Sequence, residues 1–343
     1  MPLLFISITS HSLYFLLLFL IGCFNRNEDF FVQSTINRVA GTTKDSIPVK
    51  EEVDSFAYRK RTQLLAGLSK RHLWPVQDPV PKSGAILPFK RVIAFYGNFY
   101  SSRMGVLGQY PKDEMLERLH KQVSEWDKAD SLISAIPALH YIAVTAQSSP
   151  GQSGTYRLRM PALEIKKAID WTHEINGLVF LDVQVGLSNL QTELPLLKPY
   201  LKLAEVHLGI DPEFSMKSGK RPGTSIGTYD ADDINYAIEF LKQIVIENQL
   251  PPKILVVHRF TQNMLTNYKR IKLCPEVQVV INMDGFGSPA KKKGTYQYFI
   301  YQQPVQFTGF KVFYKNDLVT GGRVMRPEEI LKLKPIPIYI QYQ

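Results

Sequence analysis

From Arg91 to the end of the chain, short hydrophobic runs rich in β-branched and aromatic residues alternate with amphipathic segments. Short apolar runs of this kind predict β-strands, and a regular alternation of strands with helical segments predicts a parallel sheet. The eight predicted strands span 91–98, 139–147, 177–186, 204–214, 253–260, 277–287, 309–317 and 336–343.

Three of the segments between these strands carry clear helix signals. The first opens with acidic residues and repeats apolar side chains at helical spacing. Pro161 stands where a first helical turn tolerates proline, and Asp230 is suited to cap the third segment. The three predicted helices span 111–132, 160–176 and 230–249.

Eight strand–helix units match the number that closes a (β/α)8 barrel of the TIM type. A doubly wound open sheet would carry a G-x-G-x-x-G loop after its first strand, and "YGNFYSSRMGVLG" does not supply it. We therefore predict an α/β protein with a (β/α)8 barrel. No helical segment follows the last strand, so the last helix is expected to be missing unless the amphipathic segment 50–73 covers that position.

Carboxylates stand where several of the predicted strands end. Strand alternation turns Asp182, Asp211 and Asp284 toward the barrel interior, with Glu213 just beyond Asp211. The C-terminal ends of the strands form the rim at which active sites of this fold lie. Any one carboxylate could instead cap a helix or pair with a lysine, but a buried unpaired carboxylate is costly and several together indicate a site. The surrounding side chains predicted to bind substrate are Tyr96, Asn98, Gln147, Gln184, His207, His258 and Asn282.

The same alternation turns Tyr141 and Thr145 inward, whereas His140 is assigned a structural role at a strand entrance. Paired carboxylates at a barrel rim suit glycoside hydrolysis, in which one carboxyl protonates the leaving oxygen and the other attacks or activates water. Asp211 or Glu213 is then the acid, and Asp182 or Asp284 the nucleophile or base.

Two other functions remain open at this point. The rim could bind glycan without cleaving it, with Tyr96, Tyr100 and Tyr156 as stacking platforms. Alternatively, the chain could be a metal-dependent hydrolase whose ligands are His207, Asp211, His258 and Asp284. No H-x-H or H-E-x-x-H spacing is present, so we predict no metal and no cofactor. The sequence alone does not decide whether the protein is an enzyme.

The N-terminal apolar run "LYFLLLFLIGC" has the length of a signal peptide and ends at Cys23. Its last four residues, "LIGC", resemble a bacterial lipobox, which implies cleavage before Cys23 and lipidation of that cysteine. The segment before the run lacks the Lys or Arg that such signals carry, and a plain signal anchor is the alternative interpretation. The domains expected are a signal peptide at 1–23, a polar tether or linker at 24–88 with one possible amphipathic helix, and the barrel at 89–343.

The net charge of +10 suggests an acidic partner such as an anionic envelope polymer, although lysines and arginines scattered on a solvated surface explain it more simply. Two long Gly/Ser-rich loops, 148–161 and 215–230, carry part of that basic charge. No nucleic-acid-binding pattern is present. The partners expected are therefore a polysaccharide or other envelope polymer and, through the lipid anchor, a bacterial membrane, and no oligomeric state is predicted.

Several longer motifs point to a family. "FYGN", "VTAQSSPG", "LDVQVG", "GIDPEF", "VVHRFTQNM", "NMDGFG" and "GFKVFY" together resemble a group of poorly characterised bacterial secreted lipoproteins and cell-envelope proteins. The similarity runs from about residue 90 to the C-terminus. It implies a barrel domain attached to the outside of the cell envelope, and it carries no reaction with it.

Overall fold

The structure, a computed structural model, describes residues 52–67 and 73–343. The predicted signal peptide and the lipidation site Cys23 lie outside these residues. Within them, no helix is long and apolar enough to cross a membrane.

Eight parallel strands close into a barrel, which confirms the predicted (β/α)8 fold. Closure is visible at β1, whose Ile93 pairs with Ile340 on one side and with Pro137 on the other. Each of the eight predicted runs overlaps one of these strands, and β2 and β10 begin before the predicted runs. The barrel strands are β1 (Arg91–Gly97), β2 (Ala135–Ala146), β4 (Leu178–Val183), β5 (Val206–Ile210), β7 (Lys253–Arg259), β9 (Val277–Met283), β10 (Phe307–Val312) and β11 (Tyr339–Tyr342).

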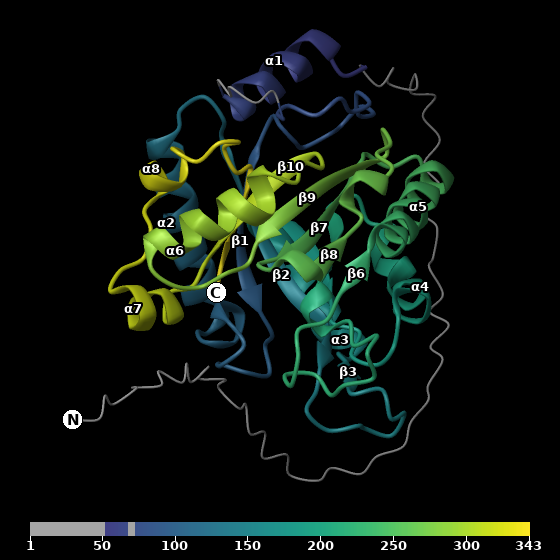
Figure 1. The fold of residues 1–343 in the computed structure, drawn as a ribbon. Helices are drawn as coiled ribbons and strands as arrows, with labels where there is room; N and C mark the ends of the chain where they lie inside the picture. Colours follow the sequence, from purple (N-terminus) through teal and green to yellow (C-terminus); the bar gives the residue numbers. More distant parts are fainter. Residues whose placement is uncertain (1–51, 68–72) are drawn as a thin grey trace, which may run out of the picture. The chain divides into compact units, whose positions relative to one another are not determined.

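Helices surround the barrel, with α3, α4 and α5 on one side and α6 and α8 on the other (Figure 1). The three predicted helices are confirmed as α2, α3 and α5. The helices outside the barrel are α2 (Lys112–Ala129), α3 (Ala162–His173), α4 (Leu190–Leu201), α5 (Ala231–Asn248), α6 (Pro289–Tyr296), α7 (Asn316–Gly321) and α8 (Pro327–Ile330).

Two positions in the outer layer depart from a regular strand–helix repeat. Between β7 and β9 the chain forms 3-10 turns and a short strand instead of an α-helix, and among the described residues β11 is the last element. Trp126 of α2 covers β11, since its Nε1 donates to the Tyr342 hydroxyl at 2.8 Å. The remaining short elements are η1 (Val106–Gly108), β3 (Arg157–Arg159), η2 (Pro212–Phe214), β6 (Tyr229–Asp230), η3 (Gln262–Met264), β8 (Leu265–Thr266), η4 (Tyr268–Arg270) and η5 (Gln297–Tyr301).

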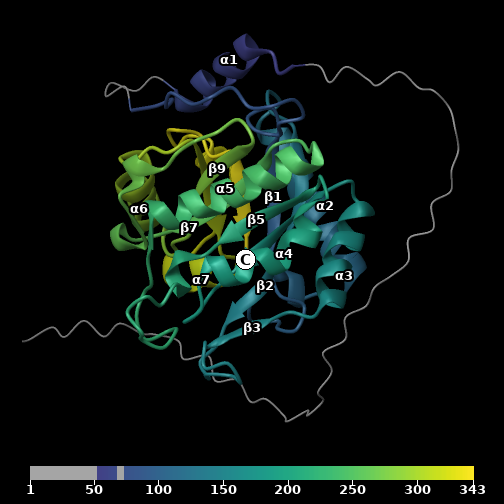
Figure 2. The same cartoon turned by 90° about the vertical axis from the view of Figure 1, so that its right-hand side faces the viewer.

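Helix α1 (Ser55–Ala66) lies over the end of the barrel where the strands begin, and Figure 2 shows it there from a second side. Tyr58, fully buried, donates its hydroxyl to Asp78, which also accepts from Arg59 at 2.6 Å and from Gln306 at 2.9 Å. The described part of the predicted linker is therefore packed onto the barrel and belongs to the same compact unit. Helix α1 covers the end of the barrel at which the strands begin. It does not occupy the position, outside the barrel, of a helix that would follow β11.

Side-chain alternation divides the core into two layers. Val179, Leu181 and Val183 of β4 point outward and pack, with their counterparts on other strands, against the surrounding helices. Phe180, which lies between Val179 and Leu181 in the strand, points inward. It belongs to a separate apolar cluster that fills the barrel interior at the end next to α1. Toward the C-terminal ends of the strands the interior becomes polar, which is where the candidate site lies.

Candidate active site at the barrel rim

The barrel gathers all four predicted carboxylates at one end. Asp182 occupies the last inward position of β4, while Asp211 and Asp284 directly follow β5 and β9. Glu213 lies in η2, whose cap is Asp211: the Asp211 Oδ1 accepts from the Glu213 backbone N–H at 3.0 Å. The Glu213 backbone is held a second time, because its carbonyl accepts from the N–H of Gly227 at 2.6 Å.

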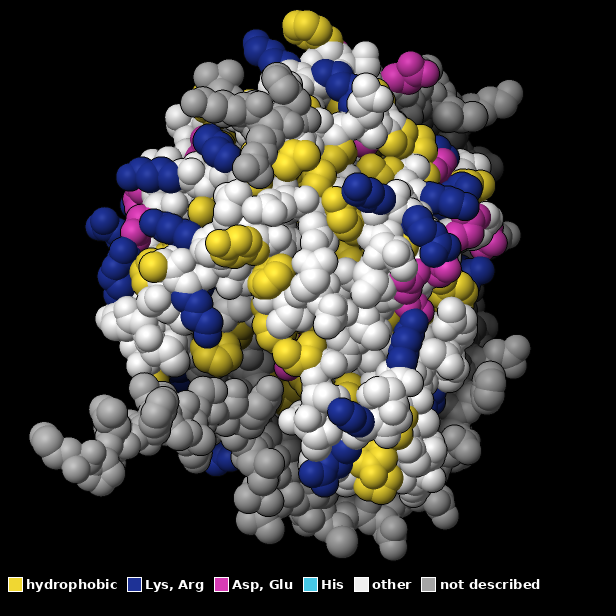
Figure 3. All heavy atoms as spheres, viewed as in Figure 1, with side chains coloured by type: hydrophobic (Ala, Val, Ile, Leu, Met, Phe, Trp, Pro, Cys, Tyr) yellow, Lys and Arg dark blue, Asp and Glu magenta, His cyan; other side chains and the backbone are white. Residues whose placement is uncertain are grey.

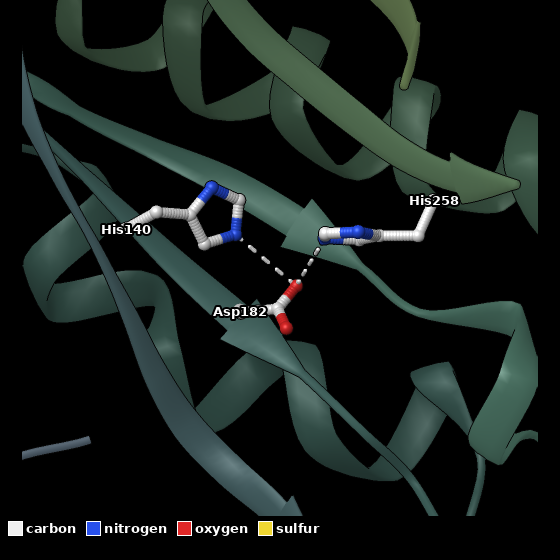
Figure 4. A group of neighbouring side chains, drawn as sticks. All are labelled: His140, Asp182 and His258. Carbon is white, nitrogen blue, oxygen red and sulfur yellow. Dashed lines mark ion pairs between the residues drawn. The ribbon is translucent and has the colours of Figure 1, made fainter. Parts of the chain in front are cut away.

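The deepest part of the site is a group of three fully buried side chains, His140, Asp182 and His258 (Figure 4). Oδ1 of Asp182 lies 3.3 Å from Nε2 of His140 and 3.4 Å from Nε2 of His258. The other carboxylate oxygen, Oδ2, accepts from the Tyr96 hydroxyl at 3.0 Å. Nδ1 of His140 lies 2.5 Å from the hydroxyl of Tyr339.

Asp284 connects this group to the rim. Its Oδ2 lies 2.8 Å from Nδ1 of His258, and its Oδ1 lies 3.0 Å from Nζ of Lys311. The Lys311 ammonium also lies 3.8 Å from the centre of the Tyr96 ring, a cation–π contact. The carboxylate of Asp284 is thus held between an imidazole and an ammonium.

The surroundings of these groups set their charges. Burial alone would raise the pKa of Asp182, but His258 and His140 lower it well below its usual range. Burial opposes the charged form of His258 too, yet Asp182 and Asp284 raise its pKa to about 10. Burial also acts against ionised Asp284, and Lys311 and His258 overcome it, so that its pKa is lowered. Two carboxylates are therefore balanced by one imidazolium and one ammonium.

His140 carries no charge at neutral pH, because burial lowers its pKa to about 4 despite the opposing effect of Asp182.

Asp211 and Glu213 have the opposite character. Burial raises the pKa of Asp211 to about 7, against the effect of His258. Burial and the neighbouring Asp211 raise the pKa of Glu213 to about 8. Glu213 is half-buried, and among the described residues its side chain forms no ion pair. At neutral pH the rim therefore holds one protonated carboxylic acid beside ionised Asp284.

Between about pH 6.5 and 8 we expect the free energy of unfolding to fall as the pH rises. Folded Asp211 and Glu213, with pKa values of about 7 and about 8, keep protons that the unfolded chain has already released. His258 acts in the same direction, because its folded pKa is raised to about 10. Glu213→Gln should flatten the slope by up to about 1.4 kcal/mol per pH unit. Urea unfolding at several pH values, with a chelator present, measures it, and an unchanged slope would contradict the pKa of Glu213.

The predicted substrate-binding residues fall into different places. Gln184 lies inside the rim, where its Nε2 donates to the Tyr96 hydroxyl at 3.3 Å and reaches Asp211 Oδ2 at 3.5 Å. Asn98 uses its side chain internally, since Nδ2 donates to the Ile142 carbonyl and Oδ1 accepts from the Tyr100 N–H. Gln147 is half-buried just beyond β2.

Two further predicted residues are buried below the rim. Asn282 is buried in β9 and neither of its side-chain polar atoms has a hydrogen-bond partner. Asp182 pairs with Gly209 of β5, and His207 is the inward residue that precedes Gly209 in that strand. Nδ1 of His207 accepts from the Ile254 N–H at 3.1 Å. The structure thus does not bring His207 to the rim carboxylates. In the part of the chain that the structure describes, the group able to hold a metal is His140, Asp182 and His258, not the set containing His207.

The expected orientation of Tyr141 was wrong: the inward residue is His140, which was not among the expected site residues. Tyr141 points outward and stacks on Phe99, with ring centres 4.7 Å apart, whereas His140 points inward. The cause is a register shift in β2 between Ile142 and Val144. A bulge adds one residue, so counting back by twos from inward Thr145 reaches the wrong face.

Lys311 is the other site residue that the sequence analysis missed. It lies in β10, where Phe310 and Val312 point outward into the outer core and so place Lys311 on the inner face. A lysine at an inward strand position indicates a site as clearly as the inward carboxylates do, because a buried ammonium group needs an anionic partner.

The basic charge is dispersed. On the face shown in Figure 3, Lys and Arg side chains lie in separate small groups. In the two long loops, Arg157 and Arg159 both pair with Glu193, at 2.8 Å and 2.7 Å, and Lys217 pairs with Asp233. Much of the loop charge that might have attracted an anion is therefore neutralised within the protein.

No protein-family model matches the sequence, and no curated protein matches it. Among solved structures 33 chains match. One of them is "Cellulase Cel5C_n", with 12% sequence identity and a TM-score of 0.43 over 78% of this chain and 79% of that chain.

Proposed function

We propose that the protein hydrolyses glycosidic bonds of an envelope or extracellular polysaccharide, with Glu213 as the general acid and Asp284 as the second carboxylate. Glycoside hydrolysis requires one protonated and one ionised carboxyl group at the scissile bond. The observation that carries the proposal is the contrast at one rim between Glu213, next to another carboxyl group and unpaired among the described residues, and Asp284, held by Lys311 and His258. Environments that push two carboxyl groups in opposite directions assign the acid and the base.

Asp182 and Asp211 are assigned supporting roles. Asp182 has no exposed surface, whereas Asp284 keeps 8% of its surface exposed and so remains within reach of a substrate or a water. Asp211 caps η2 and thereby fixes the backbone of Glu213. Asp182 positions His258, which in turn contacts Asp284.

Exposed aromatic rings near the ends of the same strands support a sugar substrate. Tyr100 follows β1 and is 62% exposed, and Phe286, two residues after Asp284, is 44% exposed. An aromatic ring that keeps a face open offers a flat apolar surface on which a sugar ring can stack.

The test is incubation of the full-length chain with crude cell-envelope polysaccharide. We expect new reducing ends to appear with time, and more slowly as the pH rises through about 8, where Glu213 loses its proton. If the protein bound the polysaccharide and no new reducing ends appeared, the protein would be a glycan-binding protein and not a hydrolase. Neither release nor retention would remove the polysaccharide as substrate class.

We also propose that the mature chain is anchored to the outside of a bacterial membrane through lipid on Cys23. The support is the sequence "LIGC" at the end of the apolar run. In bacteria fed labelled palmitate, we expect label in the wild-type chain and none in Cys23→Ala. The control is Cys274→Ala, since Cys274 is a free cysteine of the barrel domain and should leave labelling unchanged. Equal labelling of both variants would contradict the anchor.

A further inference from the structure

Two imidazole nitrogens and one carboxylate oxygen converge below the rim without conventional hydrogen bonds. Nε2 of His140, Oδ1 of Asp182 and Nε2 of His258 are all buried, and none of them has a hydrogen-bond partner of acceptable geometry. The three side chains come from β2, β4 and β7 and point toward one another (Figure 4). From this convergence we infer that His140, Asp182 and His258 bind a divalent metal ion of the zinc type.

The distances fit a metal ion better than hydrogen bonds. Oδ1 of Asp182 is 3.3 Å and 3.4 Å from the two imidazole nitrogens. Charge-assisted hydrogen bonds between such groups are about 2.7–2.9 Å long. Two ligand atoms of a tetrahedral zinc site, each about 2.0–2.1 Å from the metal, are separated by about 3.3–3.4 Å.

Each of the three ligands is oriented by a partner on its other side. His140 Nδ1 contacts the Tyr339 hydroxyl, His258 Nδ1 contacts Asp284, and Asp182 Oδ2 accepts from the Tyr96 hydroxyl. Partners of this kind fix the tautomer and ring orientation of metal-binding histidines. They direct the remaining donor atom of each side chain to the common centre.

Gly209 leaves the space beside these atoms open. A Cβ at this position would lie 2.4 Å from His140 Nε2 and 2.6 Å from Asp182 Oδ1. The residue is a glycine although it lies within β5 and needs no left-handed backbone conformation. Its lack of a side chain is thus explained by the room required around the ligand atoms.

Three protein ligands leave one position of a tetrahedral ion for water or a substrate oxygen, as in catalytic zinc sites. The contact between His258 and Asp284 would couple this ion to the rim. The inference stands without the proposed glycosidase activity, because it depends on the geometry of the three ligands alone.

The test is metal binding by the full-length chain after treatment with a chelator and dialysis. With Zn²⁺ we expect one ion per chain, bound with a dissociation constant below about 1 µM. With Co²⁺ as the spectroscopic probe we expect the strong visible absorption of a tetrahedral site. Substoichiometric Zn²⁺ binding, or only the weak absorption of six-coordinate Co²⁺, would overturn the inference.

Variants locate the ion. His140→Gln and His258→Gln should each weaken Zn²⁺ binding at least 100-fold, and Gly209→Ala should weaken it with all three ligands still present. The matched control is His207→Gln, since His207 is equally buried in the barrel but lies outside the group. It should keep the wild-type affinity. Circular dichroism checks that each variant is folded. If His207→Gln and His140→Gln lost the same affinity, or if neither lost any, the assigned site would be wrong.

Discussion

Replacing Glu213 with Gln is expected to lower the rate of sugar release by about 10²–10⁴-fold, the range that general acid catalysis contributes. Gln keeps the size and the hydrogen-bonding capacity of the side chain but has no proton to give to the leaving oxygen. The backbone of residue 213 is held by Asp211 and Gly227, so the rim should keep its shape. Initial rates of reducing-end formation, measured at saturating polysaccharide, give the effect on the chemical step.

The matched control for this variant is Glu205→Gln. Glu205 precedes β5 at the opposite end of the barrel from Glu213, and its side chain pairs with the exposed His173 at 2.7 Å. We expect wild-type rates from it. A Glu213→Gln protein that is folded and retains more than about a tenth of the wild-type rate would exclude Glu213 as the acid.

The second large effect is expected on stability. Asp182→Ala should lower the free energy of unfolding by about 3–5 kcal/mol, the cost of breaking a buried charge network by removing one partner. The network holds two carboxylates, Asp182 and Asp284, against His258 and Lys311. Without Asp182, one positive charge remains uncompensated in a fully buried place, and the Tyr96 hydroxyl loses its acceptor.

Urea unfolding in the presence of a chelator measures this loss, so that no bound metal contributes to it. The control is Asp170→Ala, which removes an exposed ion pair with Lys166 one helical turn away. Such pairs contribute about 0.3–0.5 kcal/mol. If the two variants differed by less than about 1 kcal/mol, the buried charges of Asp182, Asp284, His258 and Lys311 would not stabilise one another as a network.

Much of the fold followed from local pattern. Each barrel strand is a short apolar run that can be recognised and counted in the sequence. An extended strand cannot form its backbone hydrogen bonds within itself, so each run has to pair with other strands. Three helices with clear start signals were also predicted. The part of the chain between β7 and β9 shows the limit, since no periodic helical pattern occurs there and the chain forms short turns.

The inward direction of the rim carboxylates was equally local, because successive side chains of a strand point to opposite faces. This reasoning placed Asp182, Asp211, His258 and Asp284 correctly inside the barrel end. It failed at His140, because a bulge changes the alternation and depends on how β2 fits its neighbour β4.

The sequence by itself determined the barrel, its strands and the end of the barrel at which the carboxylates gather, since these depend on periodicities of a few residues. Only the tertiary structure decided the partners: that Asp182 lies between two histidines, that Asp284 is held by Lys311, and that Glu213 is left without a cation among the described residues. The physical reason is that the pKa of a buried group depends on burial and on charges within a few ångströms, and these charges come from strands far apart in the chain.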